Sequence, residues 1–342
     1  MLHIVGDIHF SDMTRWNHEV GNNFIKWFDT QVQTSSLEDE LLLEGDVFDR
    51  EINSGQTMLQ VKQFFDVAVS KYKKVYAIIG NHEVKVVHQH VQHPLMFLST
   101  YEKVHLIEKP EILDIQGIHT LTLPFMRFED GTLLYSYYEK ELEKYKATPF
   151  DLIAGHVNEK DPDNWLLKDG VDLTGFDVKH VAFGHIHTRI SDHYTGSVWA
   201  VKISEEDTPL PRQIQTLEKV GNELKVSGID IPKFLHYEVV DYPDPLPNMQ
   251  GQGEWCMSVF RINGLASIMN ARDYYHTPYI HSVVSGSDNK DQKDVGAEDF
   301  NSYESNEAAL DDMIQTTGKT YSRSAYSYVK GLLQQFSDKK EA

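Results

Sequence analysis

Residues 75–83 read Val-Tyr-Ala-Ile-Ile-Gly-Asn-His-Glu, a short apolar run followed by a glycine and three polar residues. The run is too short for a helix and is typical of a buried strand. The glycine allows the backbone to turn sharply where the strand ends. The asparagine and histidine that follow can supply oxygen and nitrogen ligands to a metal ion. This stretch therefore predicts a strand that brings metal-binding side chains to one edge of a sheet.

The same pattern occurs four more times in the first 190 residues. Apolar runs at 3–5, 41–43, 151–154 and 180–183 also lead into a glycine that is followed at once by Asp or His. In chain order, the five segments after the runs are Gly6-Asp7-Ile8-His9, Gly45-Asp46-Val47-Phe48-Asp49, Gly80-Asn81-His82-Glu83, Gly155-His156 and Gly184-His185-Ile186-His187. One such segment alone is compatible with a simple turn after a strand. Five in order predict that these side chains meet at the carboxyl edge of an α/β sheet.

Amphipathic helices are predicted between these strands, with a third one over residues 133–146. The apolar residues of the first two fall on one helix face, Val20, Phe24, Trp27 and Phe28 in one and Val61, Phe64, Phe65 and Ala68 in the other. Strands that alternate with helices indicate an α/β fold, in which mixed β-sheets are flanked by helices.

The residue pattern changes in the second half of the chain, where β-rich runs follow one another without helices between them. β-rich runs at 196–203, 213–217, 223–226 and 235–240 are expected to complete the main sheet, so we predict a catalytic domain over 1–243. Residues 244–284 then read as a small β-α-β domain behind a proline-rich connector. Residues 285–312 hold nine acidic and two basic residues and are predicted to be a flexible linker. A helical segment at 313–342, with an apolar face, is predicted to bind a partner or its own domain.

Composition limits the classes of function. The chain of 342 residues has a net charge of −20, which excludes a basic protein that coats DNA through Lys and Arg. Its single cysteine, Cys256, excludes a disulfide framework and favours a reducing, cytoplasmic compartment. No apolar run approaches the roughly 18 residues of a membrane span, so we expect no membrane partner.

The candidate metal ligands are too many for one ion. They are Asp7, His9, Asp46, Asn81, His156, His185 and His187. Seven ligands match two divalent ions that share a bridging carboxylate. Mixed oxygen and imidazole ligands suit Mn²⁺, Fe or Zn rather than Ca²⁺. We expect Mn²⁺, with Mg²⁺, Fe or Zn as alternatives. Two ions about 3.5–4 Å apart stabilise the attacking and leaving oxygens of a phosphoryl displacement and acidify a bridging water.

Two further residues are candidates for catalysis. His82 directly follows a predicted ligand and is suited to donate a proton to a leaving oxygen. Asp49 lies three residues after Asp46, and its carboxylate is expected to hold the imidazole of His82 in a productive tautomer.

The ordered set of motifs resembles the calcineurin-like metallophosphoesterase superfamily over residues 1 to about 205. The resemblance implies that Asp7, His9 and His187 hold the first ion and that Asp46 bridges. It further implies that the second ion is held by Asn81, His156 and His185, and that His82 is the catalytic histidine.

Within that superfamily, the chain resembles the SbcD-type, meiotic-recombination-11-like DNA-repair nucleases. The resemblance rests on the Gly196-Ser197 strand after GHIHTR, on the stretch 231–238, and on the position of the small β-α-β unit. It implies a Mn²⁺-dependent DNA exonuclease or endonuclease that acts in recombination and repair. It also implies a homodimer and an SbcC-type ATPase bound at the terminal helix. Compact pairs of this kind occur in viral recombination systems, which would place the protein in the host cytoplasm.

Two alternatives stay open. Arg50 after Asp49 also resembles Ser/Thr protein phosphatases, so a phosphoprotein or nucleotide phosphoesterase is the second candidate. A non-catalytic assembly subunit is the third, and the full ligand set argues against it. The net charge of −20 is the main objection to a DNA substrate. Local phosphate contacts would have to come from cations near the active edge, for which the candidates are Arg15, Lys85, Arg127 and Arg189.

Overall fold

The computed structural model describes residues 1–12, 15–34, 37–50, 53–87, 90–128, 134–161, 163–164, 167–201, 209–241, 244, 254–263 and 280–284. The chain forms two compact units, Met1–Ser285 and Gly286–Ala342. The second unit, with most of the predicted acidic linker and the predicted terminal helix, lies outside the described residues. The helix expected inside the small β-α-β unit lies outside them as well. The predicted domain boundaries stay predictions.

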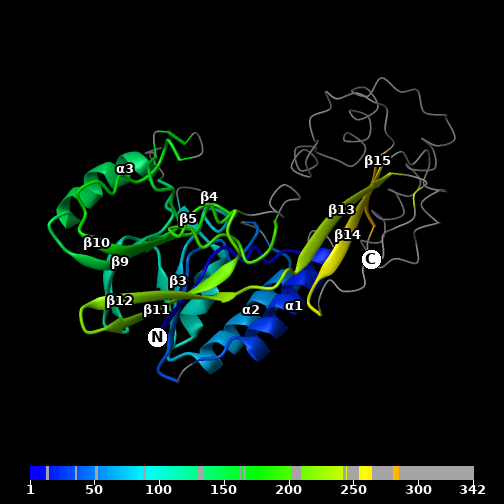
Figure 1. The fold of residues 1–342 in the computed structure, drawn as a ribbon, viewed down its shortest axis with the longest axis horizontal. Coiled ribbons are helices and arrows are strands. Elements are labelled where there is room, and N and C mark those ends of the chain that lie inside the picture. Colours follow the sequence, from blue (N-terminus) through cyan, green and yellow to red (C-terminus); the bar gives the residue numbers. More distant parts are fainter. Residues whose placement is uncertain are drawn as a thin grey trace. The chain divides into compact units, whose positions relative to one another are not determined.

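Two β-sheets form the centre of the first unit (Figure 1). The larger has the strand order β12-β11-β1-β2-β3-β6, and the smaller has the order β10-β9-β8-β7. The strands of the larger sheet are β1 (Leu2–Val5), β2 (Glu40–Leu43), β3 (Lys74–Ile78), β6 (Val104–Ile107), β11 (Gln213–Val220) and β12 (Glu223–Asp230). Those of the smaller sheet are β7 (Glu111–Ile115), β8 (Ile118–Leu123), β9 (Phe150–Gly155) and β10 (Val178–Phe183).

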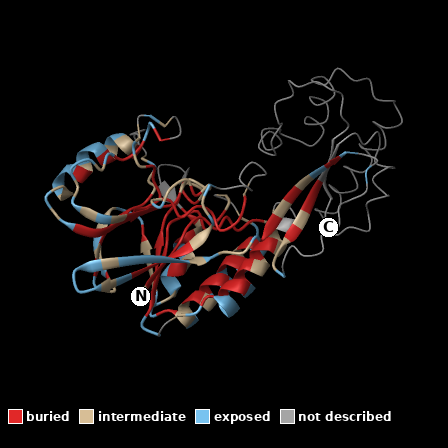
Figure 2. Ribbon diagram, viewed as in Figure 1, coloured by how far each residue is buried: buried red, intermediate tan, exposed pale blue. Residues whose placement is uncertain are grey.

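Side chains alternate across the larger sheet and so build two separate cores. In β2, Leu41 and Leu43 join the core under the helices, whereas Leu42 packs toward the smaller sheet with Leu152. This alternation follows from the two-residue period of a strand. All four residues of β2 are buried, because the strand is covered on both faces (Figure 2). That explains why the motif strands read as short, continuous apolar runs.

Helices cover the outer faces of the two sheets. Helices α1 (Arg15–Gln31) and α2 (Gly55–Lys71) pack their predicted apolar faces on the larger sheet, and Ser54 caps α2 by accepting the N–H groups of its first turn. Helix α3 (Leu134–Glu141) packs on the smaller sheet and continues into the 3-10 turn η2 (Leu142–Tyr145). The short elements β4 (Lys85–Val87), β5 (His90–Gln92) and η1 (Pro94–Thr100) lie between β3 and β6.

The strand expected at 235–240 does not join the main sheet. It forms β13 (Leu235–Asp241), which pairs in parallel with β14 (Met257–Asn263), and β14 pairs in parallel with β15 (Ile280–Val284). Apolar residues at the start of β13 and β14 pack into the core around α1. The amide of Asn23 on α1 also donates to the carbonyl oxygen of Trp255 (3.3 Å). Packing on α1, which local sequence does not reveal, therefore draws this strand into a separate three-stranded sheet.

The hairpin of β7 and β8 was absent from the sequence prediction. Its strands are joined by Gln116 and Gly117, which have φ angles of 55° and 73°. Two consecutive residues with positive φ are typical of the tight turns that join antiparallel strands. The Gln-Gly pair between two alternating runs was the available signal.

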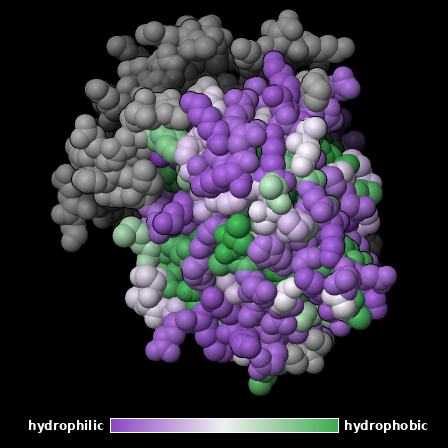
Figure 3. Space-filling view, turned by 90° about the vertical axis from the view of Figure 1, so that its left-hand side faces the viewer, coloured by the Kyte–Doolittle hydropathy of each residue, from purple (hydrophilic) through white to green (hydrophobic). Residues whose placement is uncertain are grey.

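The predicted fold class is confirmed, because mixed α/β sheets flanked by helices make up the first unit. Within the described residues, no helix combines the length and the apolar character needed to cross a membrane. The face shown in Figure 3 is predominantly hydrophilic, with hydrophobic residues in separate patches near its centre and toward its edges.

The buried histidine of β1 predicts an acid-sensitive fold. His3 is 1% exposed, and burial lowers its pKa from 6.5 to about 4. Between these two pKa values, the unfolded chain therefore binds a proton at His3 and the folded chain does not. Above pH 6.5, protonation of His3 does not reduce the free energy of unfolding. As the pH falls from 6.5 toward 4, the free energy of unfolding falls by at most about 3 kcal/mol.

Urea unfolding of wild type and His3→Gln between pH 7 and pH 4 checks this expectation. The slope of unfolding free energy against pH should be shallower in His3→Gln. Tyr72, whose hydroxyl lies 2.6 Å from the His3 ring, supplies the control. Tyr72→Phe should keep the wild-type slope, because burial is the main cause of the shift. Equal slopes in wild type and His3→Gln would contradict the assignment.

Candidate metal centre

The five motif segments meet where the two sheets pack against each other. Three of them follow β1, β2 and β3 of the larger sheet, and two follow β9 and β10 of the smaller sheet. Asp7, Asp46, His9 and His156 are each at most 1% exposed, whereas the other predicted ligands are partly exposed. The structure therefore brings all seven predicted ligands together, in a centre with a buried floor and a more open rim.

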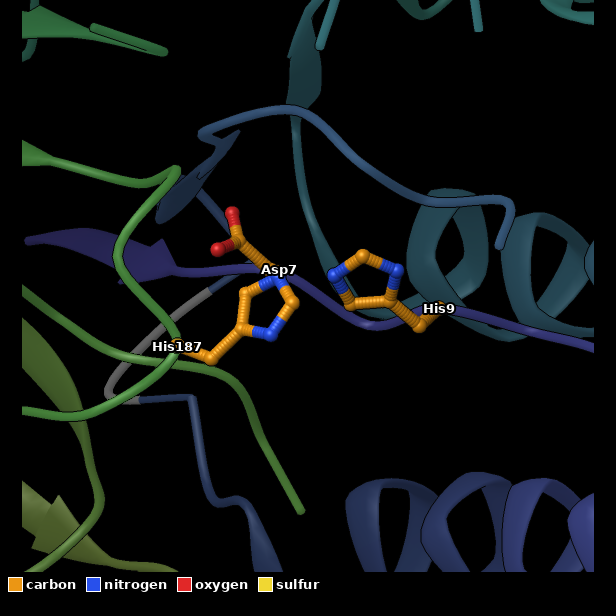
Figure 4. A group of neighbouring side chains, drawn as sticks. All are labelled: Asp7, His9 and His187. Atoms are coloured by element: carbon orange, nitrogen blue, oxygen red, sulfur yellow. The ribbon is translucent and has the colours of Figure 1, made fainter. Parts of the chain in front are cut away.

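One group of ligands comes from both sheets. The ligand atoms of Asp7, His9 and His187 all lie within 4.8 Å of one another. Figure 4 shows that Asp7 and His9 extend from the segment after β1, that His187 extends from the segment after β10, and that the three side chains gather in one region. The ring centroids of His9 and His187 are 4.5 Å apart. One carboxylate and two imidazoles at this spacing fit a transition-metal ion.

The second group is tighter. Asn81 Oδ1 lies 2.8 Å from both His156 Nε2 and His185 Nδ1, and these two nitrogens are 3.3 Å apart. Donors that each bind one ion at about 2.1 Å are about 3 Å apart when they occupy adjacent coordination positions. The amide oxygen and the two imidazole nitrogens therefore already have the spacing of metal ligands.

Asp46 lies between the two groups. Its Oδ2 atom is 3.2 Å from His156 Nε2 and 3.8 Å from His9 Nε2. This oxygen and both ring nitrogens of His9 are buried and make no hydrogen bond. A buried polar atom without a partner costs roughly 1–3 kcal/mol. Cations next to Asp46 would remove that cost, so the residues fit a pair of metal ions.

The protonation of the centre points the same way. Burial would raise the pKa of Asp46, but the charges of the neighbouring histidines, first His156, outweigh burial and lower it. Burial would lower the pKa of His156, yet Asp46 raises it to about 10. Burial, and then the charge of His156, lowers the pKa of His185 to about 3. Asp46 therefore holds one proton on His156 while His185 is neutral, and a bound metal ion would replace that proton. The buried carboxylate thus attracts positive charge to this point.

Three ligands hold a strained backbone conformation. Four non-glycine residues in the described part of the chain have a positive φ, and His9 (56°), Asp46 (45°) and His185 (79°) are three of them. This conformation costs an L-residue on the order of 1–2 kcal/mol. Hydrogen bonds within the centre hold it, since Asp46 O accepts from His9 N (2.9 Å) and the Asp7 carboxylate accepts from His185 N (3.0 Å).

Backbone carbonyls orient two of the imidazoles. His156 Nδ1 donates to Glu44 O (2.7 Å), which turns Nε2 toward the centre. His82 Nδ1 donates to the carbonyl oxygen of Asp49 (2.6 Å). We expected the Asp49 carboxylate to hold His82, but Oδ1 of Asp49 lies 3.5 Å from His9 Nδ1 instead. The main chain of Asp49 thus orients the catalytic candidate, and its side chain faces a predicted ligand.

Two buried glutamates support the centre and were not assigned a role from sequence. Glu83 accepts hydrogen bonds from the backbone N–H groups of Gly80 (2.8 Å), Phe48 (2.9 Å) and Asp46 (3.1 Å). It thereby joins the segments after β2 and β3. Glu44 is also fully buried, but its carboxyl group accepts only from the Thr195 hydroxyl. The position of Glu83 in Gly-Asn-His-Glu was a signal, whereas nothing in the sequence distinguishes Glu44.

The four residues predicted to contact phosphate lie in different surroundings. The side chains of Arg15 and Lys85 lie outside the described part of the structure. Arg127 is exposed and comes two residues after Phe125, whose ring stacks on His185 at 6.2 Å. Arg189 is 7% exposed, and its guanidinium donates to Pro211 O, Gln213 Oε1 and Asp192 Oδ1. These contacts favour a structural role for Arg189 and leave Arg127 as the described candidate.

The two glutamates generate a paired prediction. In Glu83→Gln, an amide NH₂ group would face backbone N–H donors, so we expect a loss of about 1–3 kcal/mol in stability and at least about tenfold in metal affinity. Burial raises the pKa of both carboxyl groups, of Glu44 well above its ordinary value and of Glu83 to about 8, so the two residues differ in their hydrogen bonds. Glu44 accepts only from the Thr195 hydroxyl, and the amide oxygen of Glu44→Gln can keep that hydrogen bond. The free energy of unfolding of Glu44→Gln should fall by less than about 1 kcal/mol. Thermal melts and Mn²⁺ titrations of both variants measure these effects, and equal losses would refute the distinction.

Comparison with known proteins places this centre in a family. The sequence model of the calcineurin-like phosphoesterases matches residues 2–189. No curated protein matches the chain. Among solved structures, a protein of unknown function from Aquifex aeolicus, AQ665, is 14% identical with a TM-score of 0.32, over 52% of this chain and 87% of that one. The phosphopantetheinyl hydrolase of Mycobacterium tuberculosis is 13% identical with a TM-score of 0.25, over 45% and 67% of the two chains.

The family match spans more than half of the 342 residues and includes all seven predicted ligands and His82. The chain belongs to the calcineurin-like phosphoesterase family.

Proposed function

We propose that this protein is the nuclease subunit of a DNA recombination and repair complex and that it hydrolyses phosphodiester bonds with two Mn²⁺ ions. Membership of the family makes it a metal-dependent phosphoester hydrolase. The observation that carries the proposal is the pair of ligand groups on either side of Asp46. Asp7, His9 and His187 would hold one ion, and the second would be held by Asn81, His156 and His185.

The bound ions would supply electrophilic stabilisation of the phosphoryl oxygens and would make a water molecule more acidic. The chain itself contributes the proton at the leaving group. His82 has a side chain that is 35% exposed, and its Nε2 atom lies 3.9 Å from Asp46 Oδ2. Because Nδ1 is occupied by Asp49 O, Nε2 is the nitrogen that faces the centre. Its partial exposure leaves room for a substrate oxygen, to which Nε2 would donate.

Several features favour DNA as the substrate. The Gly196-Ser197 segment, which resembles SbcD-type nucleases in sequence, hydrogen-bonds to the loop of His187. Strands β14 and β15 lie in the small unit whose position in the chain resembles that of the cap domain of that group. Arg127 is an exposed cation two residues after Phe125, whose ring stacks on His185. Two divalent ions would offset part of the net charge of −20 locally.

The proposal also includes binding partners of this chain. An SbcC-type ATPase bound at the C-terminal helical segment would provide most of the affinity for DNA. The homodimer and the cytoplasmic location that we expect from sequence also stay predictions.

A phosphomonoesterase on the same centre is the second candidate. Two observations favour it. Arg50, next to Asp49, is half-buried close to the centre, where a cation can grip a terminal phosphate group. The net charge of −20 also disfavours long-range attraction of a polyanion.

Substitution of the bridging carboxylate separates these candidates. Wild type should cut end-labelled linear duplex DNA in Mn²⁺. Asp46→Asn should cut it at least about 100-fold more slowly, because even the loss of a group that only supports a metal ligand lowers activity by up to about 100-fold. Asp172→Asn, at an exposed position, serves as the matched control. Cleavage of p-nitrophenyl phosphate by a metal-loaded protein that leaves DNA intact would select the phosphomonoesterase.

His82→Asn tests the proton donor. The variant should bind Mn²⁺ as wild type does, while kcat on DNA falls by about 10²–10⁴-fold. Bis(p-nitrophenyl) phosphate has a leaving group that needs no proton, so the loss on that diester should be much smaller. A variant that loses the same factor on both diesters would contradict the role of His82 as a general acid.

A further inference from the structure

The backbone carbonyl of His187 accepts hydrogen bonds from two other segments of the chain. Ser197 N lies 2.9 Å from this oxygen and Arg212 Nη1 lies at 3.1 Å. Ser197 Oγ lies at 3.2 Å, but its single proton has a shorter acceptor in Trp199 O (2.5 Å). The two N–H donors fix the position of the peptide group and therefore the direction in which the His187 side chain leaves the backbone. His187 is one of the three ligands of the first group.

The guanidinium of Arg212 contacts both residues of this pair, His187 and Ser197. The same Nη1 atom carries two protons; it donates to Ser197 O (2.6 Å), and its second proton is shared between His187 O and Ser197 Oγ (2.8 Å). The next residue, Val198, donates its N–H to the backbone oxygen of Asp7 (2.9 Å). The guanidinium of Arg212 thus joins two segments that position Asp7 and His187, two of the three ligands of the first group.

The segment that Arg212 holds has little freedom to shift. Gly196 adopts a φ of 72°, and a Cβ atom at this position would lie 3.1 Å from His187 O and from Arg189 N. The second group depends less on this segment. His156 is oriented by Glu44 O, which Arg212 does not contact, and only His185 is linked to it, through the hydrogen bond from its N–H to the Asp7 carboxylate. Loss of the Arg212 contacts should therefore act more strongly on the first group, in which two ligands depend on them directly.

We propose that Arg212 is a positioning residue of the first metal site and that it acts through Ser197 and the carbonyl of His187. The inference rests on the proposed function only in requiring two metal ions. Outer-shell partners of metal ligands typically change metal affinity by 10–100-fold when they are removed. We therefore expect Arg212→Ala to weaken one of two Mn²⁺ sites by that factor and to change the other by less than about threefold.

Arg189 provides a matched control. Arg189 is buried and Arg212 is half-buried, and Arg189 likewise contacts the start of β11, through Pro211 O and Gln213 Oε1. Its side-chain hydrogen bonds do not reach the carbonyl of a predicted ligand. Arg189→Ala should therefore lower the melting temperature without separating the affinities of the two sites.

A cavity beside Arg212 permits a chemical rescue. It has a volume of about 340 Å³, and its lining includes Arg212, Lys233, Trp199 and Phe234. In Arg212→Ala, a free guanidinium ion can enter from this cavity and occupy the vacated position. Millimolar guanidinium should restore Mn²⁺ affinity at the weakened site, whereas a purely structural defect would not respond. Arg212→Lys keeps the charge and should retain part of the affinity.

The experiment is Mn²⁺ titration of the full chain by calorimetry, with electron paramagnetic resonance to distinguish paired from isolated ions. Wild type, Arg212→Ala, Arg212→Lys and Arg189→Ala are compared, each with and without guanidinium. Selective loss of one site in Arg212→Ala, reversed by guanidinium, supports the proposal. Unchanged binding at both sites, or an equal loss at both sites that guanidinium does not reverse, overturns it.

The same titration separates this inference from the proposed function. A wild-type chain that binds no Mn²⁺ would remove both. Two Mn²⁺ sites in a chain that cuts no DNA, with the first site still dependent on Arg212, would remove only the proposed substrate.

Discussion

The carboxylate of Asp46 is the point on which the two sheets and the two ligand groups depend. It is 1% exposed, and its Oδ2 atom approaches histidines from both sheets. Every other polar group of the residue is also engaged. Its Oδ1 accepts from His82 N, its backbone oxygen accepts from Ile8 and His9, and its N–H donates to Glu83. A charge in such a place is stable only with opposite charge beside it, so the surrounding structure is organised to supply imidazoles and to accommodate metal ions.

The face-to-face packing of two sheets is what makes this arrangement possible. A single open sheet presents its strand ends along a line, which would separate the first and last ligands. Here the ends of β1, β2 and β3 lie opposite those of β9 and β10, and the core between the sheets holds the two sets in register. The cost is local strain at His9, Asp46 and His185, which the ligands offset by hydrogen-bonding to one another's backbone.

Much of the site was predictable from sequence, because each ligand follows a glycine at the end of an apolar strand. The pattern identified seven side chains that the structure brings together. Sequence could not assign the strands to two sheets, because buried strands of either sheet have the same apolar character. It could not tell the carbonyl of Asp49 from its carboxylate as the partner of His82. It also could not distinguish Arg189 from an exposed cation, because two of its hydrogen bonds are made to residues more than twenty positions away.

The pairing of β1 with β11 has a consequence for how the protein is made. β1 is an interior strand of the larger sheet, and its partner Leu217 is synthesised more than two hundred residues after Leu2. On the ribosome, the first four ligands emerge with β1, β2 and β3, but the last three arrive only with β9 and β10. Because a nascent chain folds from its N-terminus as units become complete, the centre cannot close before the second sheet has been translated. The order of strands along the gene thus delays metal loading until the chain can enclose the ions from both sides.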